Sequence, residues 1–388
     1  MESAAAIGID GRIVVAIEEE RVSRCKHDGA FPLGAIGECL RASGLRLRDI
    51  GHVCISGRPT LALTPAERAL VARGAHPLHA LNRGHQGAQP MVGRWDQRFL
   101  VRRLLQRSFG SCAAPISLYA PHRCDAALAK SVGPNEDALC LIIDDSSSEC
   151  PTIVACYENG RMRVLRRIDW PNSLGVYYST MTAYLGFAAG DGEYKVMGLA
   201  GFGRPVFADV IRQHILQPQA DGAYRLNRQM FGEDMTPQSK ITPALAALLG
   251  PPRAADSPIT EREKNIAASV QAVFEEAVLD LAWWSHRQKP NVRHLIITGG
   301  CALNARANGR VVASALFETV SVPPAPHAAG RAIGAICLGA QAHRPMGPQL
   351  FCRTAIWDIR STSPRLKTHS HTWAYCSPIN SKNQISSS

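Results

Sequence analysis

The clearest place for phosphate chemistry in the sequence is a glycine pair between an expected strand and an expected helix. His294–Thr298 is an apolar run, Gly299 and Gly300 follow it, and a helix is expected from Ala302. Glycines at such a junction let a phosphate approach backbone N–H groups, and the helix dipole favours an anion there. The spacing is neither a Walker A loop nor a GxGxxG fingerprint, which excludes the P-loop and Rossmann classes. A Gly-Gly turn is also a common packing device, so both interpretations stay open.

A second glycine-rich segment, Asp191–Gly203 (DGEYKVMGLAGFG), brackets an acid and a base, Glu193 and Lys195. The lysine ammonium is a point charge that can meet a phosphate or an acyl oxygen. The alternative is a loop in which the two side chains form a solvated ion pair.

Two acids end another apolar run. Asp137–Asp144 (DALCLIID) closes on Asp144 and Asp145, and Ser146–Ser148 follow. Carboxylates at a strand end are a common way to hold a cation near a phosphate. The alternative is an aspartate turn that faces solvent.

These candidates need strands and helices to position them. A capping box at Thr260–Glu263 opens a long helix, because apolar residues then recur at spacings of three, four and seven. Asn159-Gly160 predicts a hairpin between strands Thr152–Tyr157 and Arg163–Ile168. Further strands are expected at Arg12–Ile17, His52–Ser56, Pro115–Tyr119 and Thr319–Val322, and further helices at Leu33–Ser43, Cys124–Lys130, Leu174–Phe187 and Ala332–Leu338. This mixture predicts an α/β fold with mixed sheets, duplicated into two lobes.

Composition narrows the class of protein. The 388 residues, 46% hydrophobic and 19% charged, suffice for two lobes with a sizeable core. No run approaches the ~18 apolar residues of a membrane span, and the N-terminus lacks a basic-then-apolar signal. The twelve cysteines include no CxxC pair, which argues against a zinc ribbon and a disulfide framework. We therefore expect a cytoplasmic protein with free thiols and no membrane partner.

The net charge of +11 raises the question of nucleic acid as a partner. The densest basic patch is Arg94, Arg98, Arg102, Arg103 and Arg107, at helical spacing. No aromatic platform for bases is interleaved with it, so we expect an amphipathic helix with a solvated face and no nucleic-acid partner. Residues 346–388 are rich in Ser and Thr without periodicity, and we expect them to be a disordered tail after a domain at 1–345.

Three segments read together resemble the NodU/CmcH-type O-carbamoyltransferases: Gly11–Pro32, Ser173–Gly203 and Ile297–Arg310. The resemblance covers roughly residues 1–348. It implies a TsaD-like, two-lobed fold of the actin-like ATPase superfamily (ASKHA), followed in the family by a YrdC-like domain. It also implies that carbamoyl phosphate and ATP form a carbamoyl-adenylate, whose carbamoyl group passes to a hydroxyl of a small-molecule acceptor in biosynthesis.

The resemblance assigns roles to individual residues. It places Gly299, Gly300 and Asn304 in a nucleotide-binding turn, Gly192, Glu193, Lys195 and Gly198 in a second nucleotide loop, and Asp144 as a metal carboxylate at a strand end. The metal implied is iron, or another divalent ion, against the nucleotide phosphates.

The sequence departs from the family pattern at its metal and acid–base positions. The metal-binding histidine pair falls on Pro121 and Asp125, and the last carboxylate falls on Ala328. His122 and His327 lie one position from lost ligands. A site of Asp125 and Asp144 would suit a hard ion such as Mg²⁺ better than iron.

The family's acid–base histidine would fall at Met1, so no catalytic residue is assigned. The family's first strand is expected to lie upstream of the chain or to be truncated. The YrdC-like domain is not recognised here, and a separate YrdC-like protein could supply it.

Two hypotheses follow. The chain is an O-carbamoyltransferase, or it is a truncated or degenerate member that binds nucleotide without catalysis. Both require the bend after His294–Thr298 and the bend around Lys195 to face one cleft.

Overall fold

The computed structural model describes residues 2–10, 12–57, 97–134, 136–144, 150–159, 161–232, 235, 241–343 and 379–380. The chain divides into two compact units, unit 1 (Met1–Val132 with Ala328–Tyr375) and unit 2 (Gly133–His327 with Cys376–Ser388). Strands and helices occur in both, which confirms the α/β class. Apart from residues 379–380, the expected tail lies outside the described residues. No helix in the described ranges combines the length and the apolar character needed to cross a membrane.

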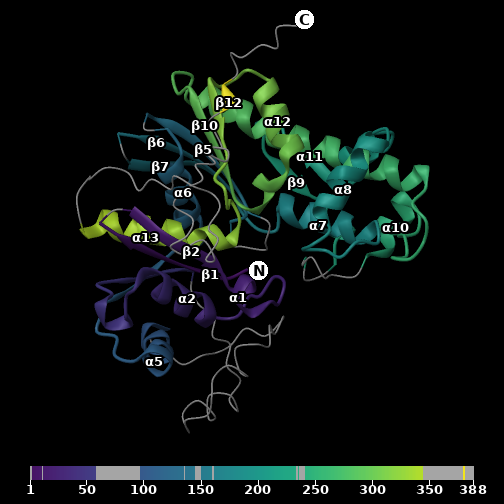
Figure 1. Cartoon of the computed structure of the whole chain (residues 1–388). Helices are drawn as coiled ribbons and strands as arrows, with labels where there is room; N and C mark the ends of the chain where they lie inside the picture. The colour runs from purple at the N-terminus through teal and green to yellow at the C-terminus, as the bar shows by residue number, and fades with distance from the viewer. Residues whose placement is uncertain are drawn as a thin grey trace, which may run out of the picture. The chain divides into compact units, whose positions relative to one another are not determined.

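Unit 2 contains a six-stranded mixed sheet in the order β12-β11-β10-β5-β6-β7 (Figure 1). Its strands are β5 (Ala138–Ile143), β6 (Thr152–Glu158), β7 (Arg161–Ile168), β10 (His294–Thr298), β11 (Thr319–Ser321) and β12 (Ile379–Asn380). β5, β10 and β11 run parallel, whereas β6, β7 and β12 are antiparallel to their neighbours. All residues of β5 are buried, which accounts for its unbroken apolar sequence. Asn159 has φ +50 at the predicted β6–β7 turn.

The helices of unit 2 are α7 (Leu174–Tyr184), α8 (Glu193–Leu199), α9 (Ala208–His214), α10 (Pro243–Leu249), α11 (Glu261–Gln288) and α12 (Ala305–Ala313). Short elements complete the unit: 3₁₀ turns η2 (Ala200–Phe202), η3 (Arg228–Met230) and η4 (Gly300–Leu303), and strands β8 (Leu216–Pro218) and β9 (Tyr224–Leu226). The predicted capping box begins α11, because the Thr260 hydroxyl accepts from the Arg262 N–H and the Glu263 carboxylate accepts from the Thr260 N–H.

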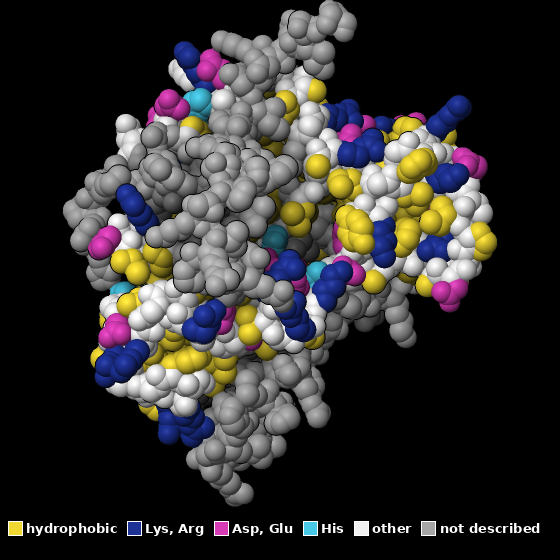
Figure 2. All heavy atoms as spheres, viewed as in Figure 1, with side chains coloured by type: hydrophobic (Ala, Val, Ile, Leu, Met, Phe, Trp, Pro, Cys, Tyr) yellow, Lys and Arg dark blue, Asp and Glu magenta, His cyan; other side chains and the backbone are white. Residues whose placement is uncertain are grey.

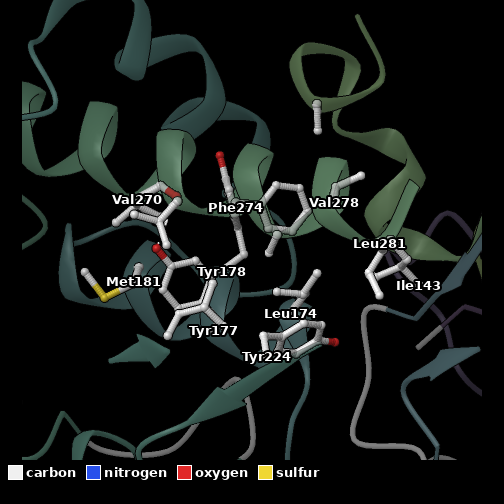
Figure 3. Packing of buried hydrophobic residues seen from close by; sticks show 14 of the residues in the cluster. Ile143, Leu174, Tyr177, Tyr178, Met181, Tyr224, Val270, Phe274, Val278 and Leu281 are labelled. Atoms are coloured by element: carbon white, nitrogen blue, oxygen red, sulfur yellow. Dashed lines mark hydrogen bonds between the residues drawn. The ribbon is translucent and has the colours of Figure 1, made fainter. Parts of the chain in front are cut away.

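The core of unit 2 includes the facing sides of α11 and α7 together with residues of the sheet. Figure 3 shows Val270, Phe274 and Val278 of α11 facing Tyr177 and Tyr178 of α7. The Tyr178 ring meets the Phe274 ring edge-on, with centroids 5.1 Å apart, and the Tyr177 hydroxyl donates to the Val270 carbonyl at 3.1 Å. Each such apolar side chain stabilises the fold by roughly 1.5–3 kcal/mol on burial. This packing fixes α7 and α11, whose polar residues contact the candidate site.

Unit 1 contains two small sheets. β1 (Ala4–Ile9) pairs antiparallel with β2 (Arg12–Glu18), and β3 (Val53–Ser56) pairs parallel with β4 (Ile116–Tyr119). The helical elements are α1 (Glu19–Ser23), α2 (Leu33–Ser43), η1 (Leu47–Asp49), α5 (Gln97–Phe109), α6 (Pro121–Val132), η5 (Ala328–Gly330) and α13 (Arg331–His343). As predicted, α2 ends at Gly44 in the left-handed conformation, with φ +70. The arginine-rich helix is also confirmed for its described part, as α5.

Candidate functional site

The ends of two parallel strands bring the first and third candidate sites together in unit 2. Gly299 follows β10 with φ +90, and a Cβ atom there would lie 2.2 Å from the Ile143 carbonyl oxygen of β5. Only glycine fits this approach. The Cys301 thiol lies 3.5 Å from the carbonyl oxygen of Asp144, the residue that follows β5. The carboxyl ends of parallel strands are a common place for ligands. Asp145 and Ser146–Ser148 lie outside the described residues.

Asn304 caps a helix and ties it to a second one. The sequence predicted a helix from Ala302, but a 3₁₀ turn intervenes and α12 starts at Ala305. The Asn304 side-chain oxygen accepts from the Ala307 N–H at 3.0 Å, which makes Asn304 the N-cap of α12. Its amide also exchanges two hydrogen bonds with the amide of Gln271 on α11, at 2.9 and 3.0 Å. These contacts assign Asn304 a role in positioning the bend.

The amide pair belongs to a larger buried network. The Tyr178 hydroxyl donates to Gln271 at 2.6 Å, and Gln271 donates to Glu275 at 2.8 Å. Gln271 is only 1% exposed, so an unpaired amide there would be costly. Glu275 pairs with Arg306 and Arg310 of α12, each at 3.3 Å. Burial raises the pKa of Tyr178, which keeps the phenol protonated as a donor.

The second glycine-rich segment contains a helix where a loop was expected. Residues Glu193–Leu199 form α8, with Gly192 as its N-cap residue. An acid in the first turn favours this helix through the dipole. The Glu193 carboxylate accepts from the Ser179 hydroxyl at 2.6 Å and from the Gly190 N–H at 2.8 Å. The ion pair between Glu193 and Lys195 that the alternative interpretation required is not formed within the described part of the chain.

Lys195 and Gly198 lie on the exposed face of α8. The Lys195 ammonium lies 5.8 Å from the centre of the Tyr194 ring and 5.9 Å from that of Phe187. A Cβ atom at Gly198 would meet no atom within 4 Å, so nothing in the described packing requires glycine there. Gly192 differs, because its Cβ would lie 2.8 Å from the Ala188 carbonyl oxygen. Gly192 therefore serves packing, whereas Lys195 and Gly198 are open to a ligand.

The two predicted segments approach each other beside α11. A Cβ at Gly203 would lie 2.1 Å from the Lys264 carbonyl oxygen of α11, so this segment packs directly on the helix backbone. A Cβ at Gly201 would lie 3.9 Å from the Arg306 guanidinium of α12, which follows the other bend. The two predicted segments are therefore neighbours within unit 2.

A hollow of about 510 Å³ lies between the η2 segment and the start of α11, lined by Gly201, Phe202, Gly203, Arg204, Glu261 and Asn265. None of the predicted nucleotide-binding residues, all of which the structure describes, lines it. Two aromatic side chains of the segment are strongly exposed, Phe202 at 75% and Tyr194 at 61%. Figure 2 shows hydrophobic side chains beside Lys and Arg side chains over the region where Figure 1 places α8. Such a surface offers both a flat apolar contact and positive charge to a ligand.

The two predicted metal carboxylates belong to different units. Asp144 follows β5 in unit 2 and is buried at 5% exposure. Asp125 lies on α6 in unit 1, and both of its oxygens accept from the Arg331 guanidinium, at 2.9 and 3.1 Å. That pairing is the contact expected of a structural carboxylate. Metal binding by Asp144 stays a prediction, and no finding tests it for Asp125.

Sequence reasoning missed a further group of possible ligands in unit 1. Ligand atoms of Glu2, Glu20 and His27 lie within 4.8 Å of one another, the one such group among the residues described. His27 is already engaged, because its Nδ1 atom lies 2.8 Å from Glu2 and its backbone N–H donates to Glu20 at 2.8 Å. Glu20 and His27 are only seven positions apart in the sequence, but their approach to Glu2 depends on the fold.

Comparison with known proteins identifies the family. The profile described as Carbamoyltransferase N-terminus matches residues 1–337. An uncharacterized protein of Synechocystis sp. is 34% identical over 343 residues, covering 86% of this chain and 54% of the relative. Nodulation protein NolNO of Sinorhizobium fredii is 29% identical over 336 residues, with 86% and 45% covered. Nodulation protein U of the same species is 25% identical over 359 residues, with 87% and 60% covered.

The chain spans about half the length of these curated relatives. Among solved structures, component A of (R)-2-hydroxyglutaryl-CoA dehydratase from Acidaminococcus fermentans matches with a TM-score of 0.42 and 13% identity. That match covers 89% of this chain and 100% of the other. The profile match spans most of the sequence and includes all three segments noted above. The chain belongs to the carbamoyltransferase family.

Proposed function

We propose that this chain is the nucleotide-binding part of an O-carbamoyltransferase with a TsaD-like, actin-like ATPase fold. The reaction transfers a carbamoyl group from carbamoyl phosphate, through an ATP-derived carbamoyl-adenylate, to a hydroxyl of a small-molecule acceptor in biosynthesis. Family membership supports the reaction class. The observation that supports a shared site is the approach of Gly201 to Arg306, because one residue belongs to each of the two glycine-bearing segments.

Each bend contributes a different interaction with the nucleotide. The Lys195 ammonium supplies positive charge to a phosphate, and the open face at Gly198 lets the nucleotide approach the α8 backbone. The Gly299 and Gly300 bend offers backbone N–H groups at the strand edge. Donors held in place before the reaction stabilise charge that develops in the transition state. The network through Gln271 and Asn304 holds α12, and with it this bend, in position.

Asp144 is the residue in unit 2 that would hold a divalent cation. One carboxylate at a strand edge fits Mg²⁺, which is commonly bound by one or two carboxylates together with substrate phosphates. Bound there, the cation would neutralise charge on the nucleotide phosphates. The residues fit iron less well, because the positions given by the resemblance hold Pro121, Asp125 and Ala328.

The second candidate is a degenerate family member that binds nucleotide without catalysis. The Asp125–Arg331 ion pair favours it, because a position expected to bind metal is already occupied by a guanidinium. The two candidates share the nucleotide site and differ in whether the carbamoyl-adenylate forms.

One pair of measurements tests the proposal and separates the candidates. ATP binding is measured by calorimetry, and pyrophosphate release is measured with ATP and carbamoyl phosphate, with and without an added YrdC-like protein. Binding with pyrophosphate release supports the transferase, and binding without release under both conditions supports the degenerate member. Failure to bind ATP refutes both.

A further inference from the structure

The pairing of Asp125 with Arg331 joins two helices at a buried point of unit 1. Asp125 on α6 is 0% exposed, and the Arg331 side chain on α13 is 14% exposed. Nε of Arg331 donates to both carboxylate oxygens, at 2.9 and 3.1 Å. The helix backbones are also in direct contact, because a Cβ at Gly334 would lie 1.9 Å from the Cys124 carbonyl oxygen. The ion pair therefore links two helices that are closely packed one residue from Asp125 and three residues from Arg331.

All three altered ligand positions lie around this ion pair. Pro121 begins α6, Asp125 lies in the second turn of that helix, and Ala328 begins the η5 turn that leads directly into Arg331. Neither Pro121 nor Ala328 has a side-chain ligand atom. The remaining carboxylate, Asp125, faces a cation that cannot lose its charge, because an arginine stays protonated at any accessible pH.

We propose that Arg331 takes the place of a metal ion as the cation that balances Asp125, so this chain holds no divalent metal through Asp125. A buried carboxylate requires a positive partner, and the guanidinium supplies one permanently. A divalent cation bound to the same oxygens would lie beside that guanidinium, and the two positive charges would repel each other. The proposal rests on the family assignment and on unit 1, and it does not depend on nucleotide binding in unit 2.

Metal retention tests the proposal without any activity assay. The wild-type chain is stripped with EDTA, incubated with excess Fe²⁺ under anaerobic conditions or with Mn²⁺, passed through a desalting column and analysed for metal. The matched variant is Asp125→Asn/Arg331→Gln, which replaces both charges with neutral side chains of similar shape and so leaves no unpaired buried charge. Circular dichroism and a thermal melt confirm that the variant is folded.

We expect wild type and the double variant to retain equal amounts of either metal. About one metal ion per chain retained by wild type and absent from the folded double variant would overturn the proposal. Asp144→Asn and His27→Gln locate any metal bound elsewhere, at the strand edge of unit 2 or at the Glu2, Glu20 and His27 group. Metal lost only in those variants leaves the proposal standing. ATP binding, measured on the same wild-type sample, reports separately on the proposed function.

Discussion

Gly198 offers the sharpest separation of ligand binding from packing, because the two roles predict different results for one substitution. Gly198 lies in α8, and a Cβ atom there would meet nothing within 4 Å. Replacing an unstrained helical glycine with alanine stabilises a protein by about 0.5–1 kcal/mol, since alanine has less backbone freedom to lose on folding. Urea unfolding of Gly198→Ala is therefore expected to show a higher free energy of unfolding.

A methyl group on the same face would obstruct a nucleotide that approaches the helix backbone. Loss of one hydrogen bond to a charged group corresponds to about 1.5–3 kcal/mol, which is roughly a 10- to 100-fold weaker affinity for ATP. Gly309→Ala is the matched control, because Gly309 lies in α12, is exposed and also has nothing within 4 Å of its Cβ position. We expect Gly309→Ala to gain similar stability and to bind ATP as wild type does.

Calorimetric titration with ATP measures the affinity that separates the two roles of Gly198. A stabilised Gly198→Ala variant with wild-type affinity would remove Gly198 from the nucleotide site. A destabilised variant would contradict the open helix face itself, because it would mean that the added methyl group meets neighbouring atoms.

Three further predictions concern charge, capping and pH. Lys195→Ala is expected to weaken ATP binding about tenfold, because it removes an exposed contact to a charged group. The control is Lys289→Ala, which breaks the ion pair with Glu158 at 2.6 Å and should leave the affinity for ATP unchanged. Equal ATP affinities of Lys195→Ala and wild type would refute the role of Lys195. Asn304→Ala removes a helix cap worth about 1 kcal/mol and two hydrogen bonds to the Gln271 amide, each worth about 0.5–1.5 kcal/mol, while that amide keeps Tyr178 and Glu275 as partners. Urea unfolding should therefore show a loss of about 2–4 kcal/mol, and Asn304→Asp, which keeps the cap, should lose less. The pKa of Glu263 is lowered, because hydrogen bonds from Thr260 and Arg262 outweigh the effect of burial, which alone would raise it. The ionised Glu263 carboxylate therefore stabilises the fold above its ordinary pKa of 4.5, and this contribution is lost as the pH falls through the lower pKa of the folded state. In Glu263→Gln, the free energy of unfolding measured against pH should change less over this range.

Elements with strong local signals were predicted closely from the sequence. β10 and α2 have the predicted bounds, and α11 begins at its capping box. In each case neighbouring residues supply the decisive interactions, a buried apolar run, a left-handed glycine or a reciprocal cap. Such signals need no knowledge of the rest of the chain, which is why they could be interpreted without it.

Elements stabilised by distant contacts were missed. β1 (Ala4–Ile9) consists of small residues with a glycine, a weak strand pattern that pairing with β2 makes regular. α8 was read as a loop because Gly192 precedes it and Gly198 lies near its end, and its Glu193 carboxylate accepts a hydrogen bond from Ser179 of another helix. Tertiary contacts override local propensity in both elements.

The same limit applied to the candidate site. Gly299, Lys195 and Gly198 were identified as residue types suited to phosphate, and the structure leaves Lys195 and Gly198 open to a ligand. The assignment of Asn304 to the nucleotide stays a prediction, and its side chain also caps α12 and pairs with Gln271 33 positions earlier. A sequence pattern gives the identity of a polar group but not the partner that already satisfies it.

Asp125 and Asp144 illustrate why a partner matters more than a residue type. Both residues are aspartates, and the sequence predicted both as ligands of a hard cation. In the structure Asp144 follows β5 beside the Gly299 bend, whereas Asp125 accepts from an arginine 206 positions away. A buried carboxylate that has a permanent cation gains little from a metal and would have to accommodate two positive charges to bind one. The proposed divalent cation therefore belongs with Asp144 at the strand edge, and a metal requirement, if measured, should respond to Asp144→Asn and not to the Asp125→Asn/Arg331→Gln pair.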